Sequence, residues 1–226
     1  MNQKTQNRQS GSTREYIYQT LKNQIMNLEL KPGTKISEKE ISETLKVSRT
    51  PVRESFLRLA QEELLEIYPQ SGTVVSYIHL DFVEEGRFVR EKLERAIVKL
   101  ACEQFPEDLL FQLETNVSTQ HLCSEKGNYK NLFELDEEFH NILFIGCNKV
   151  RTWKIIEQLK SHFNRIRMLR LVSNDNWDIM ISQHKQILEF IKQKDGDRAE
   201  KLMKEHLNLV NFDLHTLKQQ YPEYFK

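Results

Sequence analysis

The spacing of apolar residues divides the chain into two regions that meet near residue 78. In the first region, helical spacing over about 13–28 and 37–60 is followed by two short β-rich runs at 64–68 and 73–78. No other run has the alternation of a strand. In the second region, apolar residues recur three and four apart almost without interruption. Breaks at glycine, proline and polar clusters delimit six expected helices, at 80–104, 106–124, 129–146, 149–172, 176–193 and 197–218.

Residues 37–60 have the pattern of two short helices joined by a tight turn. Ser48 can cap the second helix. Its inward face would consist of Phe56, Leu57 and Ala60, and its outward N-terminal end of Arg49, Thr50 and Arg53. Such an end fits DNA, because a recognition helix inserts its N-terminal residues into the major groove, where an arginine can bind guanine through two hydrogen bonds. The following hairpin would supply a wing with Gly72 at its tip.

These elements predict a mainly α-helical protein of two domains. Residues 13–78 would form a winged helix-turn-helix domain, and residues 79–226 an all-helical bundle of about six helices. Residues 1–12 are polar, lack the apolar core of a signal peptide and are expected to form a disordered tail. No apolar run approaches the roughly 18 residues of a membrane span. We therefore expect a cytoplasmic protein without a membrane partner.

Charge and cysteine content change this picture little. The formal net charge is zero, and residues 1–77 carry 11 basic and 9 acidic side chains, a small excess of the sign that DNA binding requires. The near-zero total disfavours a non-specific architectural DNA-binding protein, which depends on many phosphate contacts. The three cysteines, Cys102, Cys123 and Cys147, are far apart and form no CxxC pair, so neither a disulfide framework nor a zinc ribbon is expected.

Four side chains in the helical region are polar yet lie in apolar stripes. Asp136 and His140 are four residues apart and share one helix face, while His184 and His206 fall in the stripes of two further helices. Polar groups on buried faces need partners. Each imidazole could be a hydrogen-bonded core residue, or one divalent ion could satisfy all four groups, since imidazole and carboxylate suit zinc, nickel and manganese. The residues alone leave both interpretations open.

The segment from Leu30 to Val75 resembles the DNA-binding domain of the GntR family of bacterial regulators. The resemblance is carried by Leu30-x-Pro32-Gly33, the run Val47-Ser48-Arg49-Thr50-Pro51-Val52-Arg53-Glu54 and the Gly72-Thr73 wing tip. It covers about 13–77 and implies DNA contacts by Ser48, Arg49, Thr50 and Arg53, with Gly72 at the wing tip. Lys39 is a further candidate, because it stands where some relatives use an arginine to reach DNA. Ser55-Phe56 replaces the more usual Ala-Leu, which we take as a packing variation.

Residues from about 80 to 218 resemble the FCD domain, the helical effector domain of the FadR subfamily of GntR regulators. The matching pieces are Arg90-x-x-Leu93-Glu94, Asp136-x-x-Phe139-His140, Gln183-His184-x-x-Ile187 and Met203-x-x-His206-Leu207. Members with one aspartate and three histidines at these positions use them as metal ligands. The resemblance therefore implies a divalent ion, zinc before nickel or manganese, on Asp136, His140, His184 and His206. Members that lack the site bind an acyl-CoA instead, which the intact ligand set disfavours.

A metal site of this kind suggests a small organic acid as effector, bound to the ion through a carboxylate. Arginine is the natural clamp for the other end of such an acid. Arg90 and Arg167 lie on inward helix faces and are the candidates, although either could instead be solvated or salt-bridged. The remaining histidines are expected to be structural or exposed: His79, His121, His162 and His215.

These features predict a homodimeric, sequence-specific transcription regulator, usually a repressor in this subfamily, that binds a pseudo-palindromic double-stranded operator. The effector would change the relative pose of the DNA-binding domains. The alternative is a metal-dependent, hydrolase-like enzyme with an accessory DNA-binding domain. Against the alternative, the sequence offers no inward carboxylate clearly placed as a general base and no nucleophile–base constellation.

Overall fold

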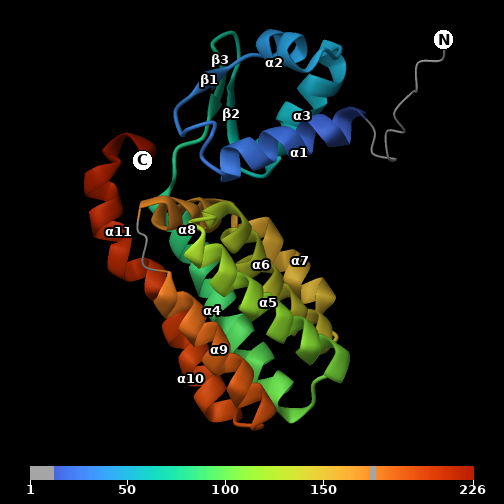
Figure 1. The fold of residues 1–226 in the computed structure, drawn as a ribbon. Helices are drawn as coiled ribbons and strands as arrows, with labels where there is room; N and C mark the ends of the chain where they lie inside the picture. The colour runs from blue at the N-terminus through green and yellow to red at the C-terminus, as the bar shows by residue number, and fades with distance from the viewer. Residues whose placement is uncertain (1–12, 174–176) are drawn as a thin grey trace, which may run out of the picture. The chain divides into compact units, whose positions relative to one another are not determined.

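The computed structural model describes residues 13–173 and 177–226, and within 210–213 it describes the backbone only. The disordered tail expected at 1–12 lies outside these residues. The contacts divide the chain between Tyr77 and Ile78 into two compact units (Figure 1), each with its own hydrophobic core.

The first unit combines helices with a small antiparallel sheet. Its elements are α1 (Thr13–Met26), β1 (Lys35–Ile36), α2 (Glu38–Leu45), α3 (Arg49–Gln61), β2 (Leu65–Tyr68) and β3 (Gly72–Val75). The strand order is β1-β3-β2. The sequence pattern does not predict β1, because two residues are too few to show alternation. The strand is defined by its partner, with Lys35 opposite Val74 and Ile36 opposite Thr73.

Helix α3 buries a face that differs from the expected one. Its buried residues are Val52, Ser55, Phe56 and Leu59. The prediction that Leu57 packs inward is wrong, since this side chain is 50% exposed and lies about half a turn from Ser55. Ser55 takes a buried position because its hydroxyl donates to the backbone oxygens of Pro51 and Arg14, at 2.8 and 3.1 Å. These bonds join α3 to α1.

The two helices of the DNA-binding pattern begin differently. The hydroxyl of Ser37 accepts a hydrogen bond from the backbone N–H of Glu40 at 3.1 Å and so caps α2. Ser48 occupies the N-cap position of α3 with an extended backbone, but its side chain makes no capping hydrogen bond. The prediction that the Ser48 side chain caps α3 is therefore wrong. Its hydroxyl is exposed at the start of the helix.

The second unit is an all-helical bundle, which confirms the expected fold class. Its elements are α4 (Leu80–Glu103), α5 (Glu107–Glu125), α6 (Tyr129–Gly146), α7 (Val150–Leu159), α8 (Ser161–Ser173), α9 (Asp178–Lys192), α10 (Gly196–Leu207), α11 (Leu209–Gln220) and the 3-10 helix η1 (Pro222–Tyr224). The described residues thus form eight α-helices rather than six. Each of the helices expected at 149–172 and 197–218 is divided into two.

The two additional breaks coincide with tertiary contacts that helical spacing does not show. Lys160, between α7 and α8, forms an ion pair with Glu137 of α6. Asn208, between α10 and α11, accepts a hydrogen bond from Arg87 at 2.8 Å and donates one to Glu91 at 3.2 Å, both on α4. Neither a glycine nor a proline marks either break.

Helix α8 is surrounded by other elements of the second unit. It contacts α4, α6, α7 and α11, and most of its residues are buried.

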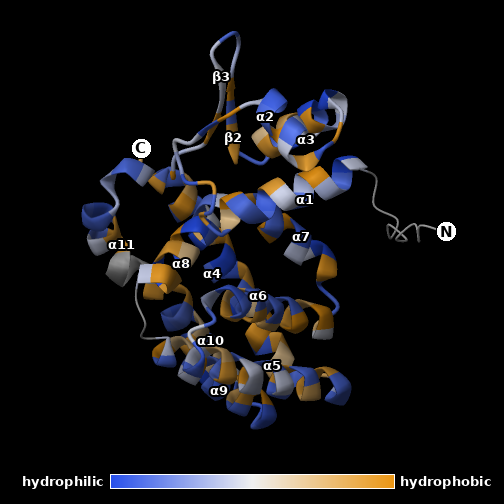
Figure 2. Cartoon of the chain, turned by 45° about the horizontal axis from the view of Figure 1, so that its top comes forward, coloured by the Kyte–Doolittle hydropathy of each residue, from blue (hydrophilic) through white to orange (hydrophobic). Residues whose placement is uncertain are grey.

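In Figure 2, hydrophobic and hydrophilic residues alternate in bands along the helices of the bundle, as amphipathic helices around a shared core require. Among the helices described, none is both long enough and apolar enough to cross a membrane.

Residues 222–226 form backbone hydrogen bonds with Ile78, the residue at which the second unit begins. Ile78 pairs with Phe225 in a parallel bridge. The backbone N–H of Ile78 donates to the Tyr224 carbonyl at 2.8 Å, and the N–H of Lys226 donates to the Ile78 carbonyl at 3.2 Å. Ile78, the first residue of the second unit, is therefore fixed by the C-terminal residues of the same unit.

Gly86 allows α4 to pack closely against the end of α7. A Cβ at this position would lie 2.7 Å from the Leu159 carbonyl oxygen and 3.4 Å from the Cβ of Phe163. We expect Gly86→Ala to lower the free energy of unfolding by about 1–3 kcal/mol through this clash, although alanine favours a helix over glycine by about 1 kcal/mol.

Urea unfolding of the purified variant measures the effect. The control is Glu85→Ala, at an exposed position of the same helix, which should change stability by less than about 0.5 kcal/mol. A Gly86→Ala protein as stable as the wild type would show that α4 and α7 can separate without cost.

Candidate functional site

The four polar residues from the apolar stripes converge on one point inside the helical unit. Asp136 and His140 lie one turn apart on α6, His184 lies on α9 and His206 on α10, and all four are buried. Their potential ligand atoms lie within 4.8 Å of one another. The Nε2 atom of His206 is 3.2 Å from the Nε2 atoms of both His140 and His184. The Asp136 carboxylate oxygens lie 3.8 Å from the same two nitrogens.

Each of the three imidazoles has an oxygen beside its other ring nitrogen. Nδ1 of His140 forms an ion-pair contact with Oε2 of Glu94. Nδ1 of His184 lies 2.8 Å from Oε1 of Gln120. Nδ1 of His206 lies 3.1 Å from Oε1 of Gln183. Because amide and carboxylate oxygens are acceptors only, each favours a hydrogen on the Nδ1 atom beside it, and this tautomer leaves Nε2 without hydrogen.

This tautomer favours one of the two interpretations that the sequence leaves open. Three Nε2 lone pairs and a carboxylate then face one another in a buried space, where a hydrogen-bonded core would need donors. The Gln120 amide is oriented by its own contacts, since its nitrogen donates to Asn116 at 2.7 Å. A divalent cation at the common point would satisfy all four acceptors. The donor set therefore fits a metal ion better than a set of core hydrogen bonds.

The electrostatics keep the imidazoles of His184 and His206 neutral and the Asp136 carboxylate charged. Burial lowers the pKa of His184 to about 3 and that of His206 well below its usual range, so both rings are uncharged at neutral pH. Burial opposes ionisation of Asp136, yet Arg167 and His140 hold its pKa below the ordinary value. Neutral imidazoles and an ionised carboxylate are the protonation states that metal binding requires.

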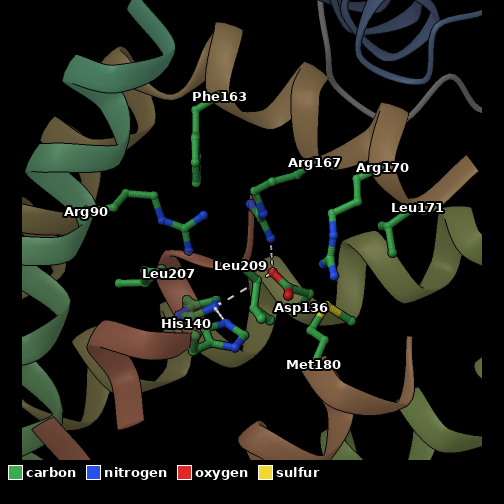
Figure 3. A pocket seen from close by; sticks show the side chains of 11 residues that line it. Arg90, Asp136, His140, Phe163, Arg167, Arg170, Leu171, Met180, Leu207 and Leu209 are labelled. Carbon is green, nitrogen blue, oxygen red and sulfur yellow. Dashed lines mark hydrogen bonds and ion pairs between the residues drawn. The ribbon is translucent and has the colours of Figure 1, made fainter. Parts of the chain in front are cut away.

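A layer of arginines and carboxylates lies beside the four ligands, and Figure 3 shows its arginines with Asp136 and His140. Arg167, on α8, forms ion pairs with Asp136 and Glu137. Arg90, on α4, donates from Nε to Glu94 at 2.5 Å and from Nη1 to Glu137 at 3.4 Å. Arg90 is only 1% exposed, and its Nη2 group has no hydrogen-bond partner. The structure thus places both arginines beside the cluster, and Arg90 keeps one buried donor unsatisfied.

A small cavity separates the arginines from the histidines. Its volume is about 30 Å³, which is room for roughly two water molecules. In Figure 3, Arg90, Arg167 and Arg170 point into this space. The residues that line it are Arg90, Asp136, His140, Phe163, Arg167, Arg170, Leu171, Met180, His206, Leu207 and Leu209.

Two carboxylates beyond Asp136, those of Glu94 and Glu137, are directed inward, although neither is among the site residues expected from the sequence. Glu94 is 1% exposed, and the Glu137 side chain is 16% exposed. Burial disfavours their charge, but Arg90 and His140 hold the pKa of Glu94 at about 2, and Lys160 with Arg167 holds that of Glu137 well below its usual range. Carboxylates this acidic are poor general bases. The spacing of Arg90 and Glu94, four residues apart, is the sequence signal that indicates this pair.

The other histidines expected to be structural or exposed include one buried ring. His162, on α8, is 1% exposed, and its Nδ1 accepts hydrogen bonds from Arg165 at 2.9 Å and from the backbone N–H of His79 at 3.1 Å. His121 is exposed and lies 3.6 Å from Glu125. His162 therefore has a structural role at the start of the helical unit.

The residues expected to contact DNA lie exposed on the first unit. Arg49, Thr50 and Arg53 occupy the first turns of α3, and Lys39 lies near the start of α2. Lys39 is 4.0 Å from Glu43, whereas Arg49 and Arg53 make no ion pair with any residue that the structure describes. Gly72 has a φ of +103°, with nothing near the position of a Cβ. The hairpin tip therefore uses a conformation that glycine tolerates best.

Two family models match the chain. Residues 13–75 match the bacterial regulatory proteins of the gntR family, and residues 87–209 match the FCD domain. The first match covers the winged helix-turn-helix unit. The second covers the helices that carry the buried cluster.

Similar proteins are regulators rather than enzymes. The HTH-type transcriptional repressor RspR of Escherichia coli K12 is 32% identical over 225 residues, which is 100% of this chain and 99% of that protein. The solved structure of McbR/YncC from E. coli has a TM-score of 0.78 at 25% identity and covers 94% of this chain and 100% of its own. A GntR-type regulator from Rhodococcus has a TM-score of 0.76 at 18% identity, covering 96% and 100%, which shows the fold alone.

The hydrolase-like alternative therefore has no support from these relatives, and the buried carboxylates are unsuited to act as bases. The exposed recognition helix, the wing and the helical bundle account for both family matches. The chain belongs to the GntR family of DNA-binding transcription regulators and carries an FCD domain.

Proposed function

We propose that this regulator is a homodimeric repressor that holds a divalent metal ion in its helical unit and responds to a small carboxylate bound at that ion. The observation that carries the proposal is the convergence of three Nε2 atoms and the Asp136 carboxylate within 4.8 Å. The similarity to a protein named as a repressor supports repression rather than activation. A dimer with two-fold symmetry is the commonest oligomer of soluble proteins, and it suits an operator with two half-sites.

The proposed metal ligands are Asp136, His140, His184 and His206. Three neutral imidazoles and one carboxylate suit zinc, and nickel or manganese are the next candidates. When bound, the ion would act as a Lewis acid that accepts an oxygen ligand from the effector. An ion with more than four coordination positions would leave places for that oxygen beside the protein ligands.

The charges around the cavity favour an anionic effector. Among the described groups around the ligands, Asp136, Glu94 and Glu137 carry negative charge, and Arg90, Arg167, Lys160 and the cavity-lining Arg170 carry positive charge. A divalent cation would add to this excess of positive charge. Arg90 and Arg167 would then bind the carboxylate, because guanidinium donates paired hydrogen bonds to such groups.

Helix α8 offers a route from this site to the DNA-binding unit. Arg167 lies on α8, and the Nδ1 atom of His162 on the same helix accepts a hydrogen bond from the backbone N–H of His79. Residues 222–226 hold the adjacent Ile78 through two backbone hydrogen bonds. A shift of α8 on effector binding would therefore reach the first two residues of the helical unit, to which the DNA-binding unit is joined.

Replacing His184 and His206 together by alanine is expected to remove the metal. Elemental analysis of purified protein should find about one divalent ion per wild-type chain and almost none in the double variant, since two of four ligands are lost. The matched control replaces His121 and His215, both exposed, and should keep the ion. Full metal occupancy in the His184→Ala, His206→Ala protein would refute the ligand assignment.

Replacing Arg49 or Arg53 by alanine is expected to reduce operator discrimination by about 1–3 kcal/mol, because each would remove a contact to a base. Fluorescence anisotropy with an operator selected from random duplexes, compared with a scrambled duplex, measures the loss. Gln61→Ala, at an exposed position at the other end of α3, serves as control. An unchanged ratio of operator to scrambled affinity would exclude base contacts by these arginines.

Deleting residues 222–226 is expected to uncouple the metal site from DNA binding. In the wild type, operator affinity should differ by about fivefold or more between metal-loaded and metal-stripped protein. In the truncated protein the difference should approach one, while metal content stays the same. Lys226→Ala keeps both backbone hydrogen bonds and should behave like the wild type. A full response in the truncated protein would show that coupling follows another route.

A further inference from the structure

The three oxygens behind the imidazoles are not equivalent. Gln120 and Gln183 offer neutral amide oxygens to His184 and His206. Glu94 offers a carboxylate to His140, and the pair is almost completely buried, with exposed fractions of 1% and 0%. One of the three ring nitrogens therefore faces a full negative charge where water is excluded.

The other oxygen of Glu94 is engaged at the same time. Its Oε1 accepts from Nε of Arg90 at 2.5 Å, while Oε2 faces Nδ1 of His140. Arg90 also lies 3.4 Å from Glu137, so a second anion is available to it. One oxygen of Glu94, together with Glu137, is therefore sufficient to pair with the positive charge of Arg90. The second oxygen is directed at the imidazole.

A carboxylate behind a metal-bound imidazole has a defined chemical effect. It orients the ring, fixes the Nδ1–H tautomer and makes Nε2 a stronger donor to the metal, and loss of such a partner typically lowers metal affinity about 10–100-fold. An amide oxygen orients the ring but adds no charge. Among the three histidines, His140 is thus the one whose ligand strength is raised by an anion.

We propose that Glu94 is a positioning residue for the metal site, which sets the affinity for the ion through His140 and links this ligand to Arg90. The proposal rests on the metal site of the proposed function. Glu94 would not touch the ion itself. It would act on the ion through the His140 imidazole, and its other oxygen would bind Arg90, a candidate effector-binding residue.

Glu91 provides a matched control on the same helix. It is also buried, at 6% exposure, and pairs with Arg87 at 2.9 Å and with Lys92 and Arg95 at 3.3 Å. It has no contact with the histidines in any of these interactions. Glu94→Gln and Glu91→Gln therefore each remove one buried charge from α4, but only the first removes the charge behind His140.

Zinc affinity, measured by competition with a chelating indicator, tests the proposal. Glu94→Gln is expected to bind zinc about 10–100-fold more weakly than the wild type, whereas Glu91→Gln should stay within about threefold of it. Adding Gln183→Glu to Glu94→Gln should recover part of the loss, because a carboxylate would then lie behind His206. Equal losses in Glu94→Gln and Glu91→Gln, or no loss in either, would overturn the proposal.

Two further measurements separate this inference from folding and from the metal assignment. Gln183→Glu alone should raise zinc affinity in the wild-type background, and a decrease or no change there counts against the inference even if Glu94→Gln does not fold. Nitrogen-15 NMR of metal-free protein should show His140 protonated at Nδ1 in the wild type, and a mixture of tautomers in Glu94→Gln. If the wild type binds no zinc, the proposed function fails; if it binds zinc and Glu94→Gln binds it equally well, only the role of Glu94 fails.

Discussion

The structure of the helical unit depends on charge compensation inside its core. Removing a carboxylate or a guanidinium from water costs several kcal/mol per ion unless opposite charges offset it. Asp136, Glu94 and Glu137 are each paired with Arg90 or Arg167. These groups come from α4, α6 and α8, so the three helices must bring their charges to one place. A purely apolar core would tolerate other relative positions of these helices.

The same constraint explains two local features of the bundle. Gly86 lies one turn before Arg90 and removes the side chain that would hold α4 away from the end of α7. Lys160 ends α7 with its ammonium group on Glu137. The next helix can therefore begin at Ser161 and bring Arg167 to Asp136. Close packing and a helix break together supply the positions that charge pairing requires.

The sequence predicts the parts of this protein that depend on local spacing. Helical periodicity gives the fold class, and the four candidate ligands are recognisable as polar residues in apolar stripes, which the structure brings together. The breaks at Lys160 and Asn208 and the strand β1 are not predictable, because they depend on partners from distant segments. Glu94 and Glu137 also escape prediction as buried groups. A glutamate in a helix usually faces solvent, and although Arg90 and Arg167 are expected to face inward, only the arrangement of neighbouring helices shows that the two glutamates face inward with them.

Electrostatics connects the two ligands proposed for the helical unit. Arg167 pairs with Asp136 and Glu137, and Arg90 and Arg170 add further positive charge around the cavity. A divalent ion would draw on the Asp136 carboxylate and add positive charge, so an acid should bind more strongly to the loaded site than to the empty one. Its carboxylate would offer Arg167 a new partner on the side of the cavity. Because Arg167 and His162 lie on one helix, a change at the arginine acts on the element that holds the backbone of His79. Metal and acid would therefore act on the same joint, and each would strengthen the effect of the other.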